Sequence, residues 1–128
     1  MALVAEELLD CCVPLAQVRE RGLDLDELSW LARCNGADVE LMRADSDSLA
    51  SFRTAVGTAS RGEAVVVASY DRAALGQTGG GHFSPIGGYH AQRDLALILD
   101  VARFKYPPHW VPAERLWQAM LPLSTPKR

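Results

Sequence analysis

The sequence has few cysteines, no long apolar run and no excess of basic residues, and each shortage excludes a class of protein. Its 128 residues include three cysteines, too few and an odd number for the disulfide framework of a small secreted domain. No apolar stretch approaches the ~20 residues of a membrane-spanning helix. Lysine and arginine number 13 against 16 aspartate and glutamate, so the net charge of −3 offers no basic surface to nucleic acid or to an anionic membrane.

The N-terminus lacks the features of a signal peptide. Glu6 and Glu7 stand where a signal peptide would be apolar, and no basic residue precedes them. Together with the odd cysteine count, this predicts a cytoplasmic protein. Hydrophobic residues make up 48% and charged residues 23%, the balance of an ordinary globular protein of one domain, or a piece of one.

Helical patterns dominate the first half of the chain. Asp24 and Glu27 have the spacing of a capping box, and leucines follow them at helical spacing towards Gly36. In chain order, we expect a helix over 14–21, a helix from 24 to 36, a short strand over 38–42 and a helix over about 47–59, capped by Ser46 or Asp47.

Strand patterns dominate the second half. The expected elements are a buried strand over 64–70, a glycine-rich loop over 76–81, a turn over 87–92, a buried strand over 95–99 and a last helix over about 112–120. Helices first and strands later predict the α+β class. We expect one domain over 1–128, with a mainly helical part at 1–62, a sheet part at 63–122 and a frayed tail at 123–128.

His82 and Asp100 form a candidate catalytic pair. If the chain turns at Ala91, both are nine residues from the turn and stand opposite each other in an antiparallel pair, with Cβ atoms roughly 4.5–5.5 Å apart. The carboxylate then accepts a hydrogen bond from one imidazole nitrogen and leaves the other as a base. Asp100 ends an apolar run, so we expect its carboxylate to be partly buried and to need a partner. A histidine that only fills space is the commoner alternative.

The three thiols lack the surroundings of a reactive cysteine. Cys34 lies near the end of its helix, where the helix dipole disfavours a thiolate, and we interpret it as a core residue. Cys11 and Cys12 are candidate ligands of a thiophilic metal. Adjacent cysteines cannot complete a tetrahedral site alone, so structural packing is the alternative. His90 and His109 are interpreted as surface or packing residues.

Two long stretches carry a family resemblance. They read GHFSPIGGY at 81–89 and DLALILDVARFKYPPHWVP at 94–112, and LDCC at 9–12 and LARCNGA at 31–37 extend them. These motifs resemble those of phytochelatin synthases, and the resemblance runs from about Leu9 to Met120. It implies a papain-like fold. It also implies an acyltransferase that moves a γ-glutamylcysteinyl unit from glutathione to glutathione or a growing phytochelatin, releasing glycine, in heavy-metal detoxification.

The resemblance also implies roles for single residues. His82 matches the catalytic histidine, Asp100 the acid that orients it, and Arg103, Lys105 and Gly81 the substrate-binding positions, where the two cations would face glutathione's carboxylates. The implied partners are glutathione, phytochelatins and heavy-metal ions, with no organic cofactor. Cd²⁺, Zn²⁺ and Cu²⁺ would activate as metal–glutathione thiolates. Assembly into a homo-oligomer is left open.

The chain departs from the family pattern in one respect. In the family, the nucleophilic cysteine lies upstream of the Asp-Cys-Cys motif, and this chain begins just before that motif. We therefore expect an internal fragment with an incomplete papain-like fold, exposed apolar surface and no activity alone, for want of the nucleophile. Two alternatives stay open: a cysteine peptidase that trims glutathione, and a non-catalytic thiol- or metal-binding fragment.

Overall fold

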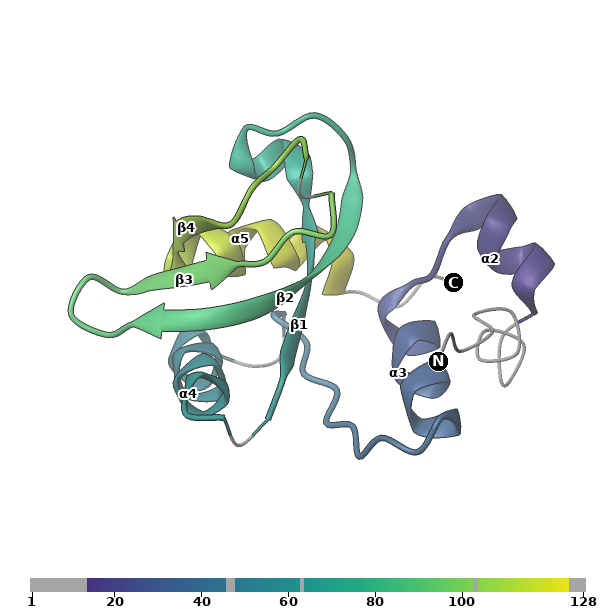
Figure 1. Cartoon of the computed structure of the whole chain (residues 1–128), viewed down its shortest axis with the longest axis horizontal. Coiled ribbons are helices and arrows are strands. Elements are labelled where there is room, and N and C mark those ends of the chain that lie inside the picture. The colour runs from purple at the N-terminus through teal and green to yellow at the C-terminus, as the bar shows by residue number, and fades with distance from the viewer. Residues whose placement is uncertain (1–13, 46–47, 63, 103, 125–128) are drawn as a thin grey trace. The chain divides into compact units, whose positions relative to one another are not determined.

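The computed structural model describes residues 14–45, 48–62, 64–102 and 104–124, and these fall into two compact units (Figure 1). One unit comprises Met1–Met42 with Pro126–Arg128, and the other comprises Arg43–Thr125. Within the described ranges, no helix is both long and apolar enough to cross a membrane.

The first unit contains two short helices, α2 (Leu15–Arg21) and α3 (Leu25–Cys34). The predicted capping box is confirmed: Asp24 Oδ1 accepts from the Glu27 backbone N–H at 2.8 Å, and Glu27 Oε1 accepts from that of Asp24 at 3.1 Å. Glu27 is also held by Arg21 through two hydrogen bonds of 2.9 and 2.6 Å. This pair of hydrogen bonds lowers the pKa of the Glu27 carboxyl, which remains ionised although it is buried.

Two predictions for this unit are wrong. The segment 38–42 has no regular structure rather than a strand, because no neighbouring strand pairs with it. Cys34 is disulfide-bonded and only half-buried, rather than a free thiol packed in the core. Its place near the end of α3 agrees with the sequence interpretation.

The second unit is built on a four-stranded antiparallel sheet in the order β1-β2-β3-β4. Its elements are α4 (Leu49–Ser60), β1 (Val66–Asp71), the short 3₁₀ helix η1 (Arg72–Leu75), β2 (Gly81–His90), β3 (Leu95–Ile98), β4 (His109–Pro112) and α5 (Ala113–Ser124). The α+β prediction is therefore confirmed, and the order of helices before an antiparallel sheet agrees with the expected papain-like architecture. Helix α4, which we placed in the mainly helical part, belongs to the same compact unit as the sheet.

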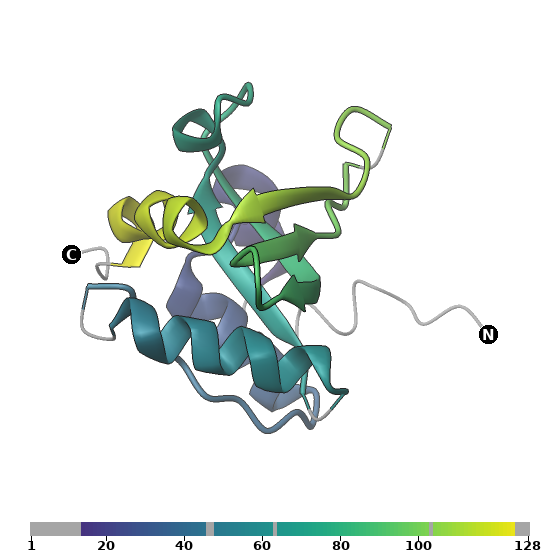
Figure 2. The same cartoon turned by 90° about the vertical axis from the view of Figure 1, so that its left-hand side faces the viewer.

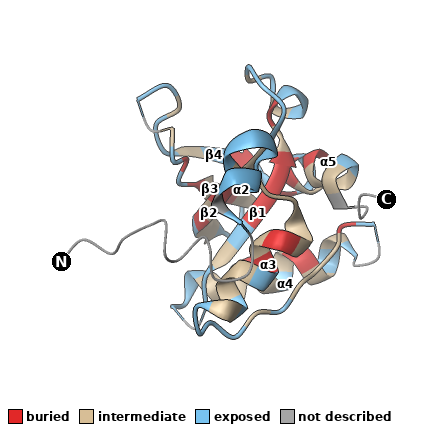
Figure 3. Ribbon diagram, turned by 90° about the vertical axis from the view of Figure 1, so that its right-hand side faces the viewer, coloured by how far each residue is buried: buried red, intermediate tan, exposed pale blue. Residues whose placement is uncertain are grey.

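One face of the sheet carries the core, and α4 and α5 pack on it (Figure 2). The core residues come from all four strands and both helices: Phe52, Val56, Ala68, Tyr70, Ile86, Ala96, Ile98, Val111, Ala113, Leu116 and Ala119. Each large side chain buried here contributes roughly 1.5–3 kcal/mol of transfer free energy. Val65, Val67, Val101 and Trp110 are exposed. Figure 3 shows buried, red stretches on the strands and on α5.

The ends of several elements differ from the prediction. The turn expected over 87–92 is wrong, since β2 continues to His90 through an irregularity between Ile86 and Gly88. Strand β4 was missed because Pro107 and Pro108 precede it and Pro112 ends it, and prolines predict an interruption of regular structure. However, β4 is an edge strand, and an edge strand tolerates a residue without an N–H. Ser48, rather than Ser46 or Asp47, caps α4 by accepting from the Ser51 N–H.

Candidate active site

The structure brings His82 and Asp100 into contact. His82 Nε2 lies 3.1 Å from Asp100 Oδ1, and the two residues come from the start of β2 and the segment just after β3. The side chain of Asp100 is fully buried and that of His82 is 19% exposed. The expected burial of Asp100 is confirmed.

The assumed register of the hairpin is nevertheless wrong. The β2–β3 ladder starts with His90 opposite Leu95, so the turn is centred between Gln92 and Arg93 rather than on Ala91. An extra residue in β2 between Gly88 and Ile86 then changes the pairing by one position. His82 lies beyond this ladder, and its backbone partner is Tyr70 of β1. The two side chains meet because both lie at the same end of the sheet, not because their backbones are directly paired.

Asp100 has a second partner that the sequence analysis missed. Arg72, the first residue of η1, donates from Nη1 to Oδ2 at 2.7 Å and from Nη2 to Oδ1 at 2.9 Å. The Ala102 backbone N–H also donates to Oδ1 at 2.9 Å. The Arg72 side chain is only 9% exposed, so this is a buried, bidentate ion pair. A signal was available, because a buried carboxylate requires a partner and Arg72 directly follows the buried strand β1.

These contacts set the protonation of the pair. The hydrogen bonds from Arg72 hold the pKa of the Asp100 carboxyl far below its usual range, so Asp100 is ionised at neutral pH. Burial, and then the positive charge of Arg72, lower the pKa of His82. Since an ionised carboxylate only accepts, the neutral imidazole carries its proton on Nε2 and has Nδ1 as its basic nitrogen.

An aromatic residue packs beside the imidazole. The Tyr70 ring meets the His82 ring edge to face, with centroids 5.8 Å apart and planes at 85°. The Tyr70 hydroxyl is hydrogen-bonded to Ser84 Oγ at 3.0 Å in the core, and burial raises the pKa of that phenol. Tyr70 therefore contributes an apolar, uncharged wall that restricts how the imidazole can rotate.

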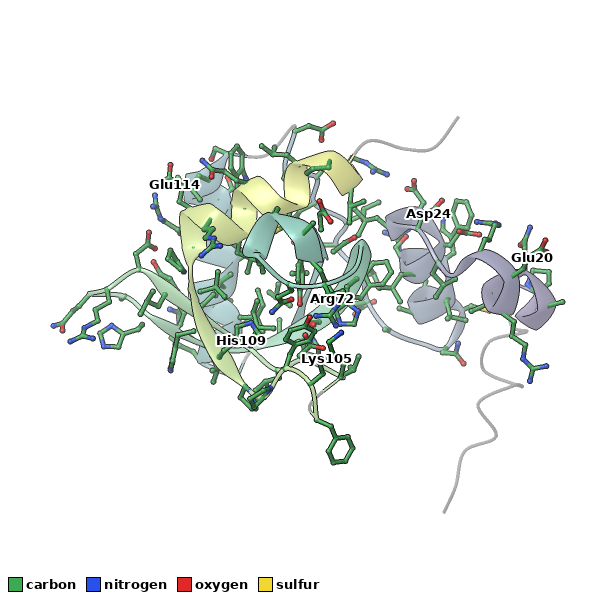
Figure 4. All side chains as sticks on the ribbon, turned by 90° about the horizontal axis from the view of Figure 1, so that it is seen from above. Glu20, Asp24, Arg72, Lys105, His109 and Glu114 are labelled. Carbon is green, nitrogen blue, oxygen red and sulfur yellow. The ribbon has the colours of Figure 1, made fainter. Side chains whose placement is uncertain are left out.

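The predicted substrate-binding residues are unequally placed. Lys105 is exposed, and its Nζ lies 5.5 Å from the centroid of the Tyr106 ring. The guanidinium carbon of Arg72 lies 4.7 Å from the same centroid. Figure 4 shows Arg72 and Lys105 in the same part of the sheet unit. Gly81 is exposed beside His82, and a Cβ there would lie 3.2 Å from Leu123 Cδ1. Arg103 lies outside the described residues.

Tyr106, and His109, which was interpreted as a surface or packing residue, belong to the surroundings of the pair. The Tyr106 hydroxyl accepts from the Thr78 N–H of the glycine-rich loop at 2.9 Å, and Tyr106 also stacks against Arg72. His109 is half-buried, and its Nε2 lies 3.2 Å from Gln77 Nε2. Both contacts join the glycine-rich loop to the segment that leads into β4.

The described part of the chain contains no group of three or more histidine, cysteine, aspartate or glutamate side chains that could hold a metal ion. Cys11 and Cys12, the predicted metal ligands, lie outside the described residues. Among the described residues, His82 can take part in proton transfer at Nδ1, close to the positive charge of Arg72.

Comparison with known proteins identifies the family. The family model for phytochelatin synthase matches residues 2–127. Glutathione gamma-glutamylcysteinyltransferase 1 of Arabidopsis thaliana is 51% identical over 126 residues, which is 96% of this chain and 26% of the relative. Glutathione gamma-glutamylcysteinyltransferase 3 of Lotus japonicus is 51% identical over 116 residues, 90% of this chain and 24% of the relative.

A more distant relative gives the same result. The glutathione gamma-glutamylcysteinyltransferase of Schizosaccharomyces pombe is 43% identical over 118 residues, 91% of this chain and 28% of the relative. The chain thus spans about a quarter of the length of these curated relatives. It belongs to the phytochelatin synthase family.

Proposed function

We propose that this chain supplies the histidine and the acid of a glutathione γ-glutamylcysteinyltransferase. The observation that carries the proposal is the buried Arg72–Asp100–His82 arrangement, in a chain about 50% identical to relatives that bear this name. In this arrangement an ionised carboxylate orients a neutral imidazole, which is the combination that activates a cysteine nucleophile.

In the proposed reaction, His82 Nδ1 takes the proton of a cysteine thiol. The thiolate attacks the carbonyl carbon of the cysteinyl–glycine bond of glutathione, and the imidazolium returns the proton to the departing glycine amine. The γ-glutamylcysteinyl thioester then reacts with the amine of a second glutathione or of a growing phytochelatin, whose proton His82 accepts. Asp100 and Arg72 hold the imidazole in place through both half-reactions.

The cysteine nucleophile is proposed to come from outside this chain. Cys34 is disulfide-bonded and belongs to the other compact unit, so it has no free thiol to offer. We therefore expect the chain alone to form no phytochelatin. The reaction would proceed when a further segment supplies the thiolate and the donors that stabilise the developing oxyanion.

Substrate recognition is assigned to the cations and the glycine at this end of the sheet. Lys105 is exposed, stands beside the Arg72–Tyr106 stack, and would meet a carboxylate of glutathione, with Arg103 as the second cation. Gly81 would let the substrate backbone pass close to His82. Heavy-metal ions such as Cd²⁺, Zn²⁺ and Cu²⁺ enter as part of the substrate, as metal–glutathione thiolates. In the chain with the Cys34 disulfide reduced, Cys11 and Cys12 are proposed as an accessory thiol site.

The proposal is tested with a chimera in which this chain replaces the 126-residue segment that it matches in the Arabidopsis thaliana relative. Given glutathione and Cd²⁺, the chimera should release glycine and form phytochelatin, both detected by mass. His82→Ala should lower the rate by at least about 10²-fold, because general base catalysis contributes that much or more. An active chimera whose turnover is unchanged by His82→Ala would refute the role of His82.

The same assay separates the alternatives. Glycine release without chain lengthening would identify a glutathione-trimming peptidase, in which water accepts the acyl group. An inactive chimera that still binds Cd²⁺ would favour a non-catalytic thiol- or metal-binding role. Phytochelatin made by the isolated chain, and lost in His82→Ala, would show that one of its three cysteines serves as nucleophile. Fractionation of the source cells should place the protein in the cytoplasm.

A further inference from the structure

A chain of hydrogen bonds leads from Arg72 away from the catalytic pair. Arg72 Nη1 donates to Gln77 Oε1 at 2.9 Å, Gln77 Nε2 lies 3.2 Å from His109 Nε2, and His109 Nδ1 lies 2.9 Å from the Pro107 carbonyl oxygen. Arg72 and His109 lie near each other in Figure 4. Gln77 and His109 have no place in the reaction proposed above, and they connect the glycine-rich loop to the start of β4.

This series of hydrogen bonds is compatible with only one placement of the protons on Gln77 and on a neutral His109. A guanidinium can only donate, so Gln77 must turn its carbonyl oxygen towards Arg72 and its amide nitrogen towards His109. The NH₂ group of the Gln77 side chain can only donate, so His109 Nε2 must accept. The ring proton of a neutral His109 is therefore on Nδ1, where it is donated to the Pro107 carbonyl, which can only accept.

The arrangement fixes the guanidinium that holds Asp100. The two protons of Arg72 Nη1 go to Asp100 Oδ2 and to Gln77 Oε1, at 2.7 and 2.9 Å. The ring of Tyr106 lies 4.7 Å from the guanidinium carbon. With these positions set, the plane of the guanidinium sets the plane of the Asp100 carboxylate, and the carboxylate in turn sets the direction of His82 Nε2–H.

We propose that Gln77 is a positioning residue for His82, oriented by His109 and acting through Arg72 and Asp100. The proposal rests on the proposed function of His82 as a base. It distinguishes two histidines of the same site by their tautomers, with the proton on Nε2 in His82 and on Nδ1 in His109. Gln77 is assigned no contact with the substrate.

The tautomers can be measured by ¹⁵N NMR of the whole chain labelled at histidine, because the sequence contains only three histidines. The unmodified protein should show His82 as the Nε2–H form and His109 as the Nδ1–H form at neutral pH. Gln77→Met removes both hydrogen bonds at similar side-chain size. In this variant, His109 should keep its Nδ1–H form, because the Pro107 carbonyl still accepts that proton. The pKa of His82 should rise towards its ordinary value as Arg72 is held less firmly.

Two further variants keep the test decisive. Gln118→Met makes the same change at an exposed position on α5 and should leave both histidines as in the unmodified protein. Gln77→Glu retains the acceptor for Arg72 and removes the donor to His109. It should therefore keep the Nε2–H form of His82 while His109 becomes protonated on Nε2. If Gln77→Met does not fold, this variant carries the test.

An Nε2–H tautomer of His109 in the unmodified protein would overturn the proposal. So would a folded Gln77→Met protein in which His82 titrates as before. Neither measurement involves turnover, so the result is independent of the proposed function. An inactive chimera whose histidines show the expected tautomers would refute the acyltransferase role and leave the geometry of Gln77 standing.

Discussion

The two ends of the β2–β3 pair use the same chemical groups for different purposes. At the hairpin end, Asp94 accepts from Arg53 at 2.6 and 3.0 Å and from the Tyr89 hydroxyl at 2.5 Å. At the open end, Asp100 accepts from Arg72 and from His82. Each aspartate thus holds an arginine and one ring donor.

The two ends differ in how far the ion pair is buried and in the ring that donates to the aspartate, which is the Tyr89 phenol at one end and the His82 imidazole at the other. The side chains of Arg53 and Asp94 are 39% and 33% exposed, whereas those of Arg72 and Asp100 are 9% and 0% exposed. A phenol titrates near 10 and an imidazole near 6.5, so only the open end changes its charge close to neutral pH. An arginine–aspartate pair that is partly solvated thus stabilises the turn, whereas a buried pair of the same kind holds an imidazole that can titrate.

The backbone conformation of Asp94 also indicates that this residue stabilises the hairpin turn. Asp94 has a φ of +54°, a conformation that aspartate and asparagine tolerate better than most residues. Its carbonyl accepts from the Ala113 N–H at 2.9 Å, which connects the turn to the start of α5. Asp94 therefore joins three elements, while Asp100 joins the groups assigned to the chemistry.

The largest effect on stability is expected at the open end. Asp100→Ala leaves Arg72 buried without its counter-ion, and breaking a buried pair in this way costs about 3–5 kcal/mol of unfolding free energy. The measurement is urea unfolding followed by circular dichroism. A double variant, Asp100→Leu with Arg72→Met, removes both charges and should recover much of the loss. Equal losses in the single and double variants would show that the cost is one of packing.

The corresponding change at the hairpin end should cost less. Asp94→Asn keeps a residue that tolerates the positive φ and removes the charge that faces Arg53. Since that pair is partly solvated, we expect a loss of about 1 kcal/mol, measured in the same urea titration. Salt should reduce this loss and leave that of Asp100→Ala almost unchanged. A loss as large as at Asp100 would remove the distinction between the two ends.

The pH dependence of stability should also separate the ends. The pKa of His82 is lowered in the folded protein, so the unfolded chain binds the proton more tightly, and the unfolding free energy should fall as the pH drops through about 6.5. Asp94 and Asp100 have lowered pKa values, and their stabilisation is present above about pH 4 and lost below it.

Substitution of His82 tests whether this residue causes the fall in unfolding free energy near pH 6.5. His82→Gln should flatten the pH dependence between pH 7.5 and 5.5 and leave the acidic loss in place. The same substitution at His90, which is exposed at the end of β2, serves as the control and should leave the slope as it was. A slope that persists in His82→Gln would contradict the assignment.

The smallest effect is expected at Gly87, inside the irregular stretch of β2 between the two ends. A Cβ at this position would lie 2.5 Å from Leu99 Cδ1, so Leu99 must move. Because Leu99 is 40% exposed, it can rotate away, and Gly87→Ala should cost about 1 kcal/mol or less. Adding Leu99→Ala should remove the clash. A larger loss that survives Leu99→Ala would point to the backbone of the bulge itself.

The sequence predicted the residues of the site better than their geometry. His82 and Asp100 were paired correctly because a charged residue that ends an apolar run must find a partner. The register was wrong because the turn lies over residues 91–94 rather than around Ala91, and an irregularity in β2 then changes the pairing again. The side-chain alternation used to assign strands locates neither feature. The two ends of the hairpin therefore could not be placed from residue counts alone.

Arg72 and β4 were missed for different physical reasons. Arg72 lies in a 3₁₀ helix of four residues, too short to have a hydrophobic period. The sequence of β4 ends in Pro112, which has no N–H and is readily accommodated because the strand is at the edge of the sheet. Strand order is a tertiary property, so the sequence did not show this. The capping box of α3, by contrast, depends on residues three apart and was predicted in full.

The central claim is that the Asp100 end carries chemistry and the Asp94 end carries structure. The most direct test is the rate of glycine release by the Arabidopsis thaliana chimera carrying either Asp100→Asn or Asp94→Asn. Loss of the carboxylate that orients a catalytic imidazole lowers turnover by on the order of 10³-fold or more, and we expect this for Asp100→Asn. Asp94→Asn should remain within about threefold, the range of a small stability change. Equal rates in the two variants would contradict the account.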